Sequence, residues 1–261
     1  MSAIILTNLA KNYGSYEAVK NLNLSVKEGE LFGFLGPNGA GKTTTIKMMT
    51  GLLEPTAGSV SVCGTDIWAS PIEAKRKIAY VPDQPNLYPK LTGREYLKFI
   101  ASIFQISSSE FEEHAEKWLQ LFQLSERADE LIEGYSHGMK QKIALCGALI
   151  HNPDVIFLDE PTVGLDPKSA RTLKNLLRSI CDNGTTVFIT THILEIAEQL
   201  CDRVAIILEG QVIAQGTMEE LRRQGGKDEA SLEDIFLQLT GDEEQQKLIE
   251  ELAKEEHGEH V

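Results

Sequence analysis

The chain has 261 residues, 42% of them hydrophobic and 25% charged, which is typical of a soluble globular protein with one large domain or a main domain and a smaller lobe. The formal net charge of −14 argues against electrostatic binding to nucleic acid. No apolar run is long enough to predict a membrane-spanning helix, and the four cysteines lack the spacing of metal ligands.

The N-terminal part of the chain predicts two strands and a phosphate loop. The sequence MSAIILTNLAKNYG has an apolar run without a basic lead-in, so it predicts a first strand rather than a signal peptide. The apolar run from Leu31 to Leu35 predicts a buried parallel strand. Residues 36–43, GPNGAGKT, match the complete pattern G-x-x-x-x-G-K-[ST]. Residues 44–50 have helical character, and Gly51 is placed to end that helix.

This loop pattern predicts a nucleotide site. Its glycines let the backbone curl so that N–H groups point at phosphate oxygens, and the helix that follows presents its positive N-terminal end to the same anion. Lys42 adds a positive charge near the β- and γ-phosphates, and the Thr43 hydroxyl is placed to coordinate Mg²⁺. The strand-to-helix setting favours this interpretation over a glycine-rich turn with a chance lysine. The motif alone does not choose between a kinase, a GTPase and a transport ATPase.

A helical region is predicted in the middle of the chain. Within residues 91–132, the sequences LTGREYLKFIASIF and SEFEEHAEKWLQLFQL place apolar residues at helical spacing. Thr92 is a candidate N-cap, and Glu95 three residues later completes a capping box. Further on, EGYSHGMKQK, residues 133–142, has the composition of a surface turn that leads into a helix.

Two carboxylates end a second buried strand. The apolar run from Val155 to Leu158 ends in Asp159 and Glu160, and carboxylates at such a position lie on the ligand side of a parallel sheet. Asp159 can hold Mg²⁺ through its water shell, and Glu160 is placed to polarise an attacking water, a division of tasks that fits hydrolysis. The alternative is an acidic strand end in which a carboxylate caps a helix.

A histidine follows the next predicted strand. Residues 186–190 predict a central strand, and His192 lies just past its end. A lone histidine after a strand is more often structural than catalytic. Here it is expected on the same edge of the sheet as Lys42 and Asp159, where it can contact the γ-phosphate and the water.

The C-terminal part predicts a hairpin and a helix. Residues 203–208 and 211–215 are the predicted strands, and Glu209-Gly210 supplies the turn. The sequence SLEDIFLQLTG, residues 231–241, predicts an amphipathic helix. An acidic tail follows it.

Together these motifs resemble the ATP-binding cassette of ABC transporters, from about Ile4 to Gly241. Residues 36–43 match Walker A and residues 155–160 match Walker B, while Gly164-Leu165-Asp166 is similar to the D-loop and His192 to the switch histidine. The resemblance implies an α/β fold of the P-loop NTPase type, with a mostly parallel sheet, an N-terminal antiparallel β part and an inserted helical subdomain.

The resemblance also implies domain boundaries. It places an ABC ATP-binding domain at residues 1–241, with the helical subdomain at about residues 82–147, and leaves residues 242–261 as the acidic C-terminal tail. The surface of the helical subdomain would meet a coupling helix of a membrane subunit, with Leu87, Tyr88 and Phe99 as candidate contacts. The alternative for each of these side chains is packing in the core of the subdomain.

The resemblance assigns residues to two nucleotide-binding surfaces. Tyr13 matches the aromatic residue that stacks on adenine, and Tyr16 is a nearby competitor. The sequence Tyr135-Ser136-His137-Gly138-Met139 falls where the family has Leu-Ser-Gly-Gly-Gln. The residues implied for ATP on the same chain are Tyr13, Gly36, Pro37, Asn38, Gly39, Ala40, Gly41, Lys42, Thr43 and Thr44. Those implied for the ATP of a facing subunit are Ser136, His137, Gly138 and Asp166.

The glutamine loop departs from the family pattern. The family often has Tyr-x-Pro-Gln after a strand, and here the sequence is Tyr80-Val81-Pro82-Asp83-Gln84. The register puts Asp83 in the glutamine position and Gln84 one place late. The implied metal ligands are therefore Thr43, Asp159 and either Gln84 or Asp83.

The function implied is hydrolysis of ATP with Mg²⁺ in a transporter subunit. The catalytic residues would be Glu160, His192 and Lys42. Two cassettes would face head to tail as a homodimer or heterodimer and power an integral membrane permease, with export favoured over import. The chain would be cytoplasmic, peripheral on the inner face of the cell membrane, and would not bind nucleic acid. The alternative is a soluble ABC ATPase that acts in cofactor or complex assembly.

Overall fold

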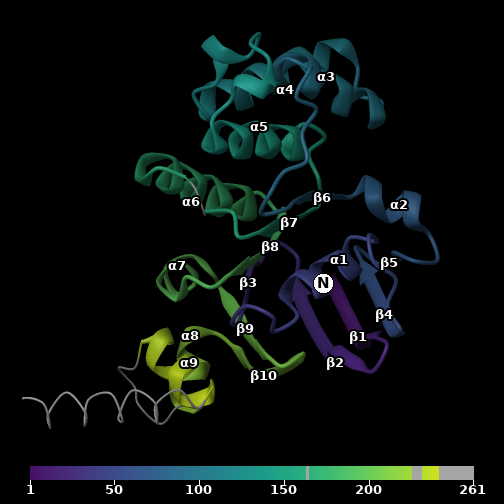
Figure 1. Cartoon of the computed structure of the whole chain (residues 1–261), viewed down its shortest axis with the longest axis vertical. Helices are drawn as coiled ribbons and strands as arrows, with labels where there is room; N and C mark the ends of the chain where they lie inside the picture. Colours follow the sequence, from purple (N-terminus) through teal and green to yellow (C-terminus); the bar gives the residue numbers. More distant parts are fainter. Residues whose placement is uncertain (163–164, 225–230, 241–261) are drawn as a thin grey trace, which may run out of the picture.

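The structure is a computed structural model that describes residues 1–162, 165–224 and 231–240. Two sheets and the helices around them form the molecule, as Figure 1 shows. The acidic tail predicted at residues 242–261 and Gly164 of the predicted D-loop lie outside the described residues. Within these ranges, the helices are too short or too polar for any of them to span a membrane.

The smaller sheet is antiparallel and contains the N-terminal strands. Its strand order is β2-β1-β4-β5. Its strands are β1 (Ser2–Tyr13), β2 (Tyr16–Lys27), β4 (Ala57–Val62) and β5 (Thr65–Asp66). The first predicted strand and the antiparallel N-terminal β part are thereby confirmed.

The larger sheet is mostly parallel and carries the predicted central strands. Its order is β10-β9-β3-β8-β7-β6, and only the β9–β10 pair is antiparallel. Its strands are β3 (Leu31–Leu35), β6 (Ile78–Val81), β7 (Val155–Asp159), β8 (Thr186–Thr191), β9 (Arg203–Leu208) and β10 (Gln211–Gly216). Parallel pairing brings the carboxyl ends of β3, β7 and β8 to one edge of this sheet, where ligands bind in folds of this type.

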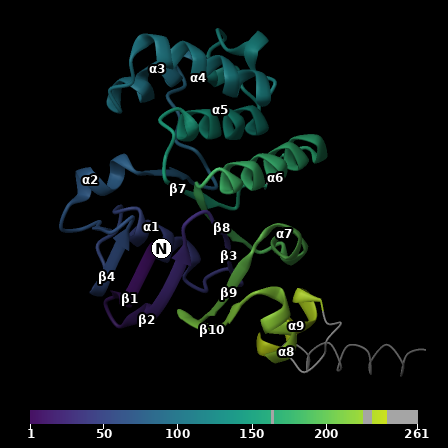
Figure 2. The ribbon, with the colours of Figure 1, turned by 180° about the vertical axis from the view of Figure 1, so that it is seen from behind.

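Helices cover both faces of the larger sheet. The helices of the described residues are α1 (Lys42–Met49), α2 (Pro71–Arg76), α3 (Gly93–Ile103), α4 (Ser108–Leu121), α5 (His137–Leu149), α6 (Pro167–Asp182), α7 (Leu194–Leu200), α8 (Met218–Gln224) and α9 (Leu232–Thr240), with short 3-10 turns at Ser125–Arg127 and Ile132–Gly134. In Figures 1 and 2, α6 and α7 lie on one side of the sheet, and α1 with the antiparallel sheet lies on the other.

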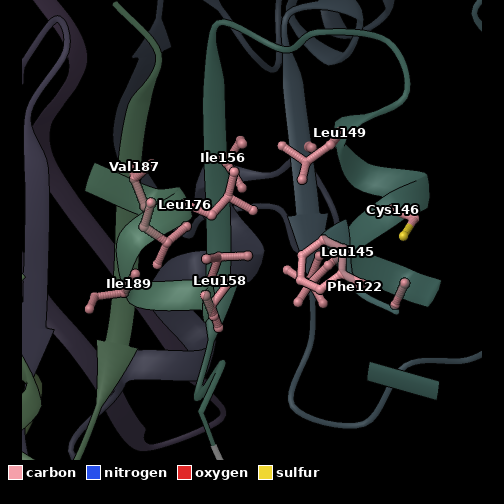
Figure 3. Close-up of a cluster of buried hydrophobic side chains, with 14 of the residues drawn as sticks. Phe122, Leu145, Cys146, Leu149, Ile156, Leu158, Leu176, Val187 and Ile189 are labelled. Carbon is pink, nitrogen blue, oxygen red and sulfur yellow. The ribbon is translucent and has the colours of Figure 1, made fainter. Parts of the chain in front are cut away.

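Each central strand faces two hydrophobic cores, because successive side chains point to opposite faces. On β7, Ile156 and Leu158 belong to the core shared with α5 and α6, whereas Phe157 belongs to the core shared with α1 and the antiparallel sheet. Phe188 of β8 stacks on Phe32 with a centroid distance of 5.6 Å in that second core. Figure 3 shows the first core between the strands and the helices. The sheet edge is thus fixed from both sides.

The helical region lies at one end of the molecule (Figure 1), and its last helix packs against the larger sheet. It comprises α3, α4 and α5, the last of which ends at Leu149 rather than 147. The predicted capping box of α3 is confirmed: the Thr92 hydroxyl accepts from the Glu95 amide at 3.1 Å, and the Glu95 carboxylate accepts from the Thr92 amide at 2.8 Å. Such a cap satisfies amide groups that have no partner within the helix.

The predicted late hairpin is also confirmed. Glu209 and Gly210 form its turn with φ angles of +48° and +80°, as a two-residue hairpin turn requires. The Gly210 amide donates to the carbonyl of Ala40 at 3.0 Å, and the Gly210 carbonyl accepts from the amide of Lys20 at 2.8 Å. This turn therefore connects the phosphate loop with strand β2. The predicted C-terminal helix corresponds to α9, with Ser231 and Asp234 hydrogen-bonded at its start.

Candidate active site

The phosphate loop connects β3 to α1 and packs closely against its surroundings. A Cβ atom at Gly36 would lie 2.3 Å from the carbonyl oxygen of Ile207, so only glycine fits there. Gly41 has a φ of +107°, and a Cβ atom there would lie 2.7 Å from the carbonyl oxygen of Ala18. The conformation of the loop therefore requires glycine at positions 36 and 41.

Lys42 points into the loop that precedes it. Its Nζ donates to the carbonyl oxygens of Gly36 at 2.6 Å and Pro37 at 3.1 Å, and the residue is buried. Burial lowers the pKa of the ammonium, while the negative charges of Glu160 and Asp159 oppose that shift. A single cation is thus held among backbone groups at the start of α1, with two carboxylates close enough to affect its charge.

Asp159 ends β7 and is buried, with both oxygens hydrogen-bonded. Its Oδ2 accepts from the Thr43 hydroxyl at 3.3 Å, and its Oδ1 accepts from the Thr190 hydroxyl. The predicted pair of metal ligands, Thr43 at the start of α1 and Asp159 at the end of β7, is therefore brought together. Hydroxyl and carboxylate oxygens are the donors that Mg²⁺ prefers.

Glu160 contacts His192. Its Oε1 lies 3.0 Å from Nδ1 of His192, and its Oε2 lies 3.4 Å from the His192 amide nitrogen. The Glu160 side chain is 14% exposed, whereas that of His192 is 53% exposed. Glu160 has a φ of +51°, in the left-handed region that non-glycine residues seldom adopt. Strained backbone of this kind occurs often at functional sites, and here it aims the carboxylate at the histidine.

These side chains surround a cavity of about 380 Å³. Among the described residues it is lined by Tyr13, Tyr16, Ala18, Asn38, Gly39, Gly41, Lys42, Thr43, Thr44, Asp83, Asp159 and Glu160. Gly36, Pro37 and Ala40 belong to the same loop without lining the cavity, and His192 is joined to it through Glu160. The cavity is thus lined by two tyrosines, by the phosphate loop with the start of α1, and by three carboxylates.

The predicted signature lies elsewhere on the chain. Ser136 is the N-cap of α5, where its hydroxyl accepts from the Met139 amide at 3.3 Å. Ser136 and His137 are exposed, and Gly138 is half-buried. None of these residues is part of the lining of the cavity formed by the described residues. The predicted surface turn before a helix is therefore confirmed.

Asp166 begins α6 and is linked to the signature helix. Its Oδ1 accepts from the Ser169 amide at 3.0 Å, and its Oδ2 lies 3.9 Å from Nζ of Lys142 on α5. Hydrogen bonds from Ser169 lower the pKa of Asp166. Asp166 thus lies with Ser136 and His137 outside the cavity.

Comparison with known proteins identifies the family. The ABC transporter family model matches residues 19–163. Over 234 residues the chain is 42% identical to the linearmycin resistance ATP-binding protein LnrL of Bacillus subtilis (strain 168), which covers 89% of this chain and 73% of that protein. The chain belongs to the ABC transporter family. As in the cassettes of this family, its function is to bind and hydrolyse ATP in a transporter.

Further relatives of this ABC cassette are also named as ATP-binding proteins of ABC or export systems. It is 42% identical over 221 residues to the Nod factor export ATP-binding protein I of Burkholderia orbicola (strain AU 1054), covering 85% of this chain and 73% of that protein. A solved ATP-binding subunit of an ABC transporter superposes with a TM-score of 0.88 at 34% identity, over 91% of this chain and 99% of that one. A dimeric ATP-binding cassette in a post-hydrolysis state, bound to ADP and Pi, superposes with a TM-score of 0.76 at 29% identity, over 82% and 98%.

The cassette's glutamine-loop segment brings Asp83, and not Gln84, to the cavity. Asp83 is half-buried and lines the cavity, whereas Gln84 is exposed and is absent from the lining in the described part of the chain. Burial raises the pKa of Tyr80, and the charges of Asp159 and Asp83 raise it further, so both carboxylates lie near this hydroxyl. The geometry therefore favours the register in which Asp83 occupies the glutamine position.

One residue of the ABC cassette's site was missed in the sequence. Thr190 of β8 is buried and hydrogen-bonded to the side chain of Asp159 and the backbone of Glu160. The available signal was the pair of threonines that follows the apolar residues VFI at the end of the strand TVFITT. Buried hydroxyls need hydrogen-bond partners, so this pair already indicated a polar neighbour at the sheet edge.

Proposed function

We propose that this ABC cassette hydrolyses MgATP between two facing cassettes and powers export through a separate membrane-spanning subunit. The observation that carries the proposal is the division of the chain into two parts. The phosphate loop, Asp159 and Glu160 converge on one cavity, while the signature residue Ser136 is exposed and outside that cavity. The exposed signature residues would therefore contact the nucleotide bound in the cavity of a second copy of the chain.

Within the cavity, each side chain would contact a different part of the nucleotide. Tyr13 would stack on adenine, with Tyr16 as the second aromatic residue at that side of the cavity. The loop amides of residues 38–44 and the Lys42 ammonium would bind the phosphates, because both present positive charge at the start of α1. The 380 Å³ volume is within the range of small-molecule sites.

The residues at the sheet edge fit a magnesium ion. Thr43 and Asp159 supply two oxygen ligands, and among the described residues no group of three or more His, Cys, Asp or Glu side chains could hold a metal ion. This arrangement suits Mg²⁺, which is usually bound by one or two protein ligands, several waters and substrate phosphates. The ion would neutralise charge on the β- and γ-phosphates. Asp83, which lines the cavity, would be a third oxygen ligand.

Hydrolysis needs a water aligned with the γ-phosphorus. The Glu160 carboxylate would accept a hydrogen bond from this water and take its proton as the new oxygen–phosphorus bond forms and the bond to ADP breaks. His192, 3.0 Å from Glu160, would hold the carboxylate and contact the γ-phosphate. Lys42 would offset the negative charge that moves to the leaving oxygen.

The facing cassette would complete the site with Ser136, His137, Gly138 and Asp166. The Ser136 hydroxyl and the N-terminal end of α5 are suited to a γ-phosphate, since helix starts favour anions. Each chain carries both surfaces, so two identical copies suffice for a closed pair with twofold symmetry. The dimeric cassette bound to ADP and Pi, which resembles this chain, supports that arrangement.

The membrane partner would contact the helical region, residues 82–147. Tyr88 and Phe99 form an exposed aromatic pair there, with ring centroids 5.2 Å apart and 51% and 39% of each residue exposed. Leu87 packs instead against the core, which fits the alternative for that side chain. The relatives named for Nod factor export and linearmycin resistance support export. The cassette would then lie on the inner face of the cell membrane.

Purification from native membranes tests this proposal. The tagged cassette, solubilised in mild detergent, is expected to retain a protein with several membrane spans, and ATP hydrolysis by that complex should exceed hydrolysis by the cassette alone. The double variant Tyr88→Ser/Phe99→Ser should lose the partner and keep the basal ATPase rate. Recovery of the cassette only in a membrane-free complex would contradict the transport role and support an assembly ATPase.

A further inference from the structure

Thr190 lies at the centre of the catalytic sheet edge. It is the fifth residue of β8, which runs between β3 and β7, and it pairs with Asp159 in the parallel register. Its relative exposure is 0%. A hydroxyl at such a position must find hydrogen-bond partners within the protein, because an unpaired buried polar group is destabilising.

The hydroxyl of Thr190 connects the two acidic residues of Walker B. Its single proton is donated to Oδ1 of Asp159. Its oxygen lies 3.2 Å from the amide nitrogen of Glu160 and accepts a hydrogen bond from it. The same amide lies 3.1 Å from the carbonyl oxygen of Thr190. The side chain and backbone of one residue therefore contact both Asp159 and Glu160.

These bonds fix two orientations that the reaction needs. With Oδ1 of Asp159 bonded to Thr190 and Oδ2 facing Thr43 at 3.3 Å, the plane of the carboxylate is set. The bonds to the Glu160 amide hold that residue in its left-handed conformation, with φ at +51°, from which its carboxylate reaches His192. Both carboxylates line the cavity in which the reaction is proposed to take place.

We propose that Thr190 is a positioning residue for ATP hydrolysis: its hydroxyl orients Asp159 toward the metal site and holds Glu160 in the conformation that faces the attacking water. Thr190 is not among the described residues that line the cavity, and it acts through the two carboxylates. The inference rests on the roles proposed above for Asp159 and Glu160. A hydrogen bond to a ligating carboxylate typically affects metal affinity or activity by about 10- to 100-fold.

The chain offers a matched set of variants. Thr190→Val keeps the side-chain shape and the backbone carbonyl and replaces the hydroxyl with a methyl group. Thr190→Ser keeps the hydroxyl. Thr186→Val makes the same change at the other end of β8, where the buried Thr186 hydroxyl accepts from the Gly29 amide at 3.1 Å, far along the strand from the cavity. Any general cost of losing a buried hydroxyl in this strand is therefore measured separately.

Two readouts test the proposal: Mn²⁺ affinity by electron paramagnetic resonance in the presence of a non-hydrolysable ATP analogue, and steady-state kcat. For Thr190→Val we expect Mn²⁺ affinity and kcat to fall by about tenfold or more each, with KM for ATP little changed. Thr190→Ser should restore both values, and Thr186→Val should retain both. Wild-type Mn²⁺ affinity and kcat in Thr190→Val, or equal losses in Thr190→Val and Thr186→Val, would overturn the positioning role.

One further variant separates this inference from the proposal on which it rests. Asp159→Asn should lower Mn²⁺ affinity whether or not Thr190 matters. If Asp159→Asn binds Mn²⁺ as the wild type does, the metal role proposed for Asp159 is wrong. If Asp159→Asn loses affinity while Thr190→Val does not, only the inference about Thr190 is overturned.

Discussion

The Walker region and the signature region of this chain differ in how they are held. Lys42 lies at the start of α1, and Asp159 and Glu160 lie at the carboxyl end of β7, a strand between two hydrophobic cores. Each of the three makes hydrogen bonds or close ionic contacts within the chain. Ser136 lies at the start of one helix, is exposed, and uses its hydroxyl to cap that helix. Folding of one chain brings the Walker residues together, whereas it leaves Ser136 exposed on the surface.

This difference separates the steps that one chain can carry out alone from the steps that need a second chain. Residues that must contact a nucleotide in an isolated chain gain from preorganisation, since fixed groups need no rearrangement when charge develops. Residues that act on a second chain gain from exposure, because their ligand arrives with the partner. Mutations in the Walker region should therefore affect the isolated cassette, and mutations in the signature should affect only the assembled pair.

The largest effect is expected for Glu160→Gln. The amide cannot accept a proton from water, so the steady-state rate of phosphate release should fall by about 100-fold or more. ATP affinity, measured by calorimetry, should stay close to the wild-type value because the phosphate loop is intact. Glu54→Gln, at an exposed position outside the cavity, is the matched control and should retain full activity. Near-normal turnover in Glu160→Gln would contradict the role of this carboxylate.

Ser136→Arg should separate the two regions. A bulky cation at this exposed position would prevent close approach of the facing chain, so hydrolysis should fall by at least about tenfold, as for loss of a transition-state hydrogen-bond donor. ATP binding to the monomer should be unchanged. Ser108→Arg, also exposed at the start of a helix, controls for the introduced charge. Hydrolysis at the wild-type rate in Ser136→Arg would contradict the role of this segment at a second chain and leave it as an ordinary surface turn.

Asp83→Asn should have the smallest effect and should sharpen the assignment of the glutamine loop. Removal of a negative charge from the cavity wall should raise ATP affinity in the absence of metal by roughly two- to fivefold, because a like charge near a solvated phosphate costs about 1 kcal/mol. Gln84→Ala should leave that affinity unchanged, since Gln84 is exposed. Calorimetry in the presence of a chelator measures both. An effect of Gln84→Ala alone would reverse the assignment.

Much of this architecture was predictable because its signals are local. The apolar runs of β3 and β7 give the buried strands, the Thr92 and Glu95 pair gives a helix start, and Glu209-Gly210 gives a hairpin turn. Each depends on residues a few positions apart. The Walker A loop was predictable for the same reason, since its glycines encode its own backbone conformation.

The remaining features depend on contacts between distant segments. The left-handed conformation of Glu160 is held by Thr190, thirty positions along the chain, and no local pattern predicts it. The choice between Asp83 and Gln84 depends on how a loop packs against the sheet edge, which sequence register leaves open. The role proposed for Ser136 requires a second chain, so neither the local pattern nor the fold of one chain contains its ligand.

The hairpin turn at Gly210 connects two parts of the proposed nucleotide site. Its amide bonds to Ala40 in the phosphate loop and its carbonyl to Lys20 in β2, the strand that begins at Tyr16. Gly210 thereby connects the antiparallel sheet, which carries both cavity tyrosines, to the phosphate loop, which surrounds Lys42. In the nucleotide site proposed above, the distance between the tyrosines and the phosphate loop is therefore set by the fold of the chain itself.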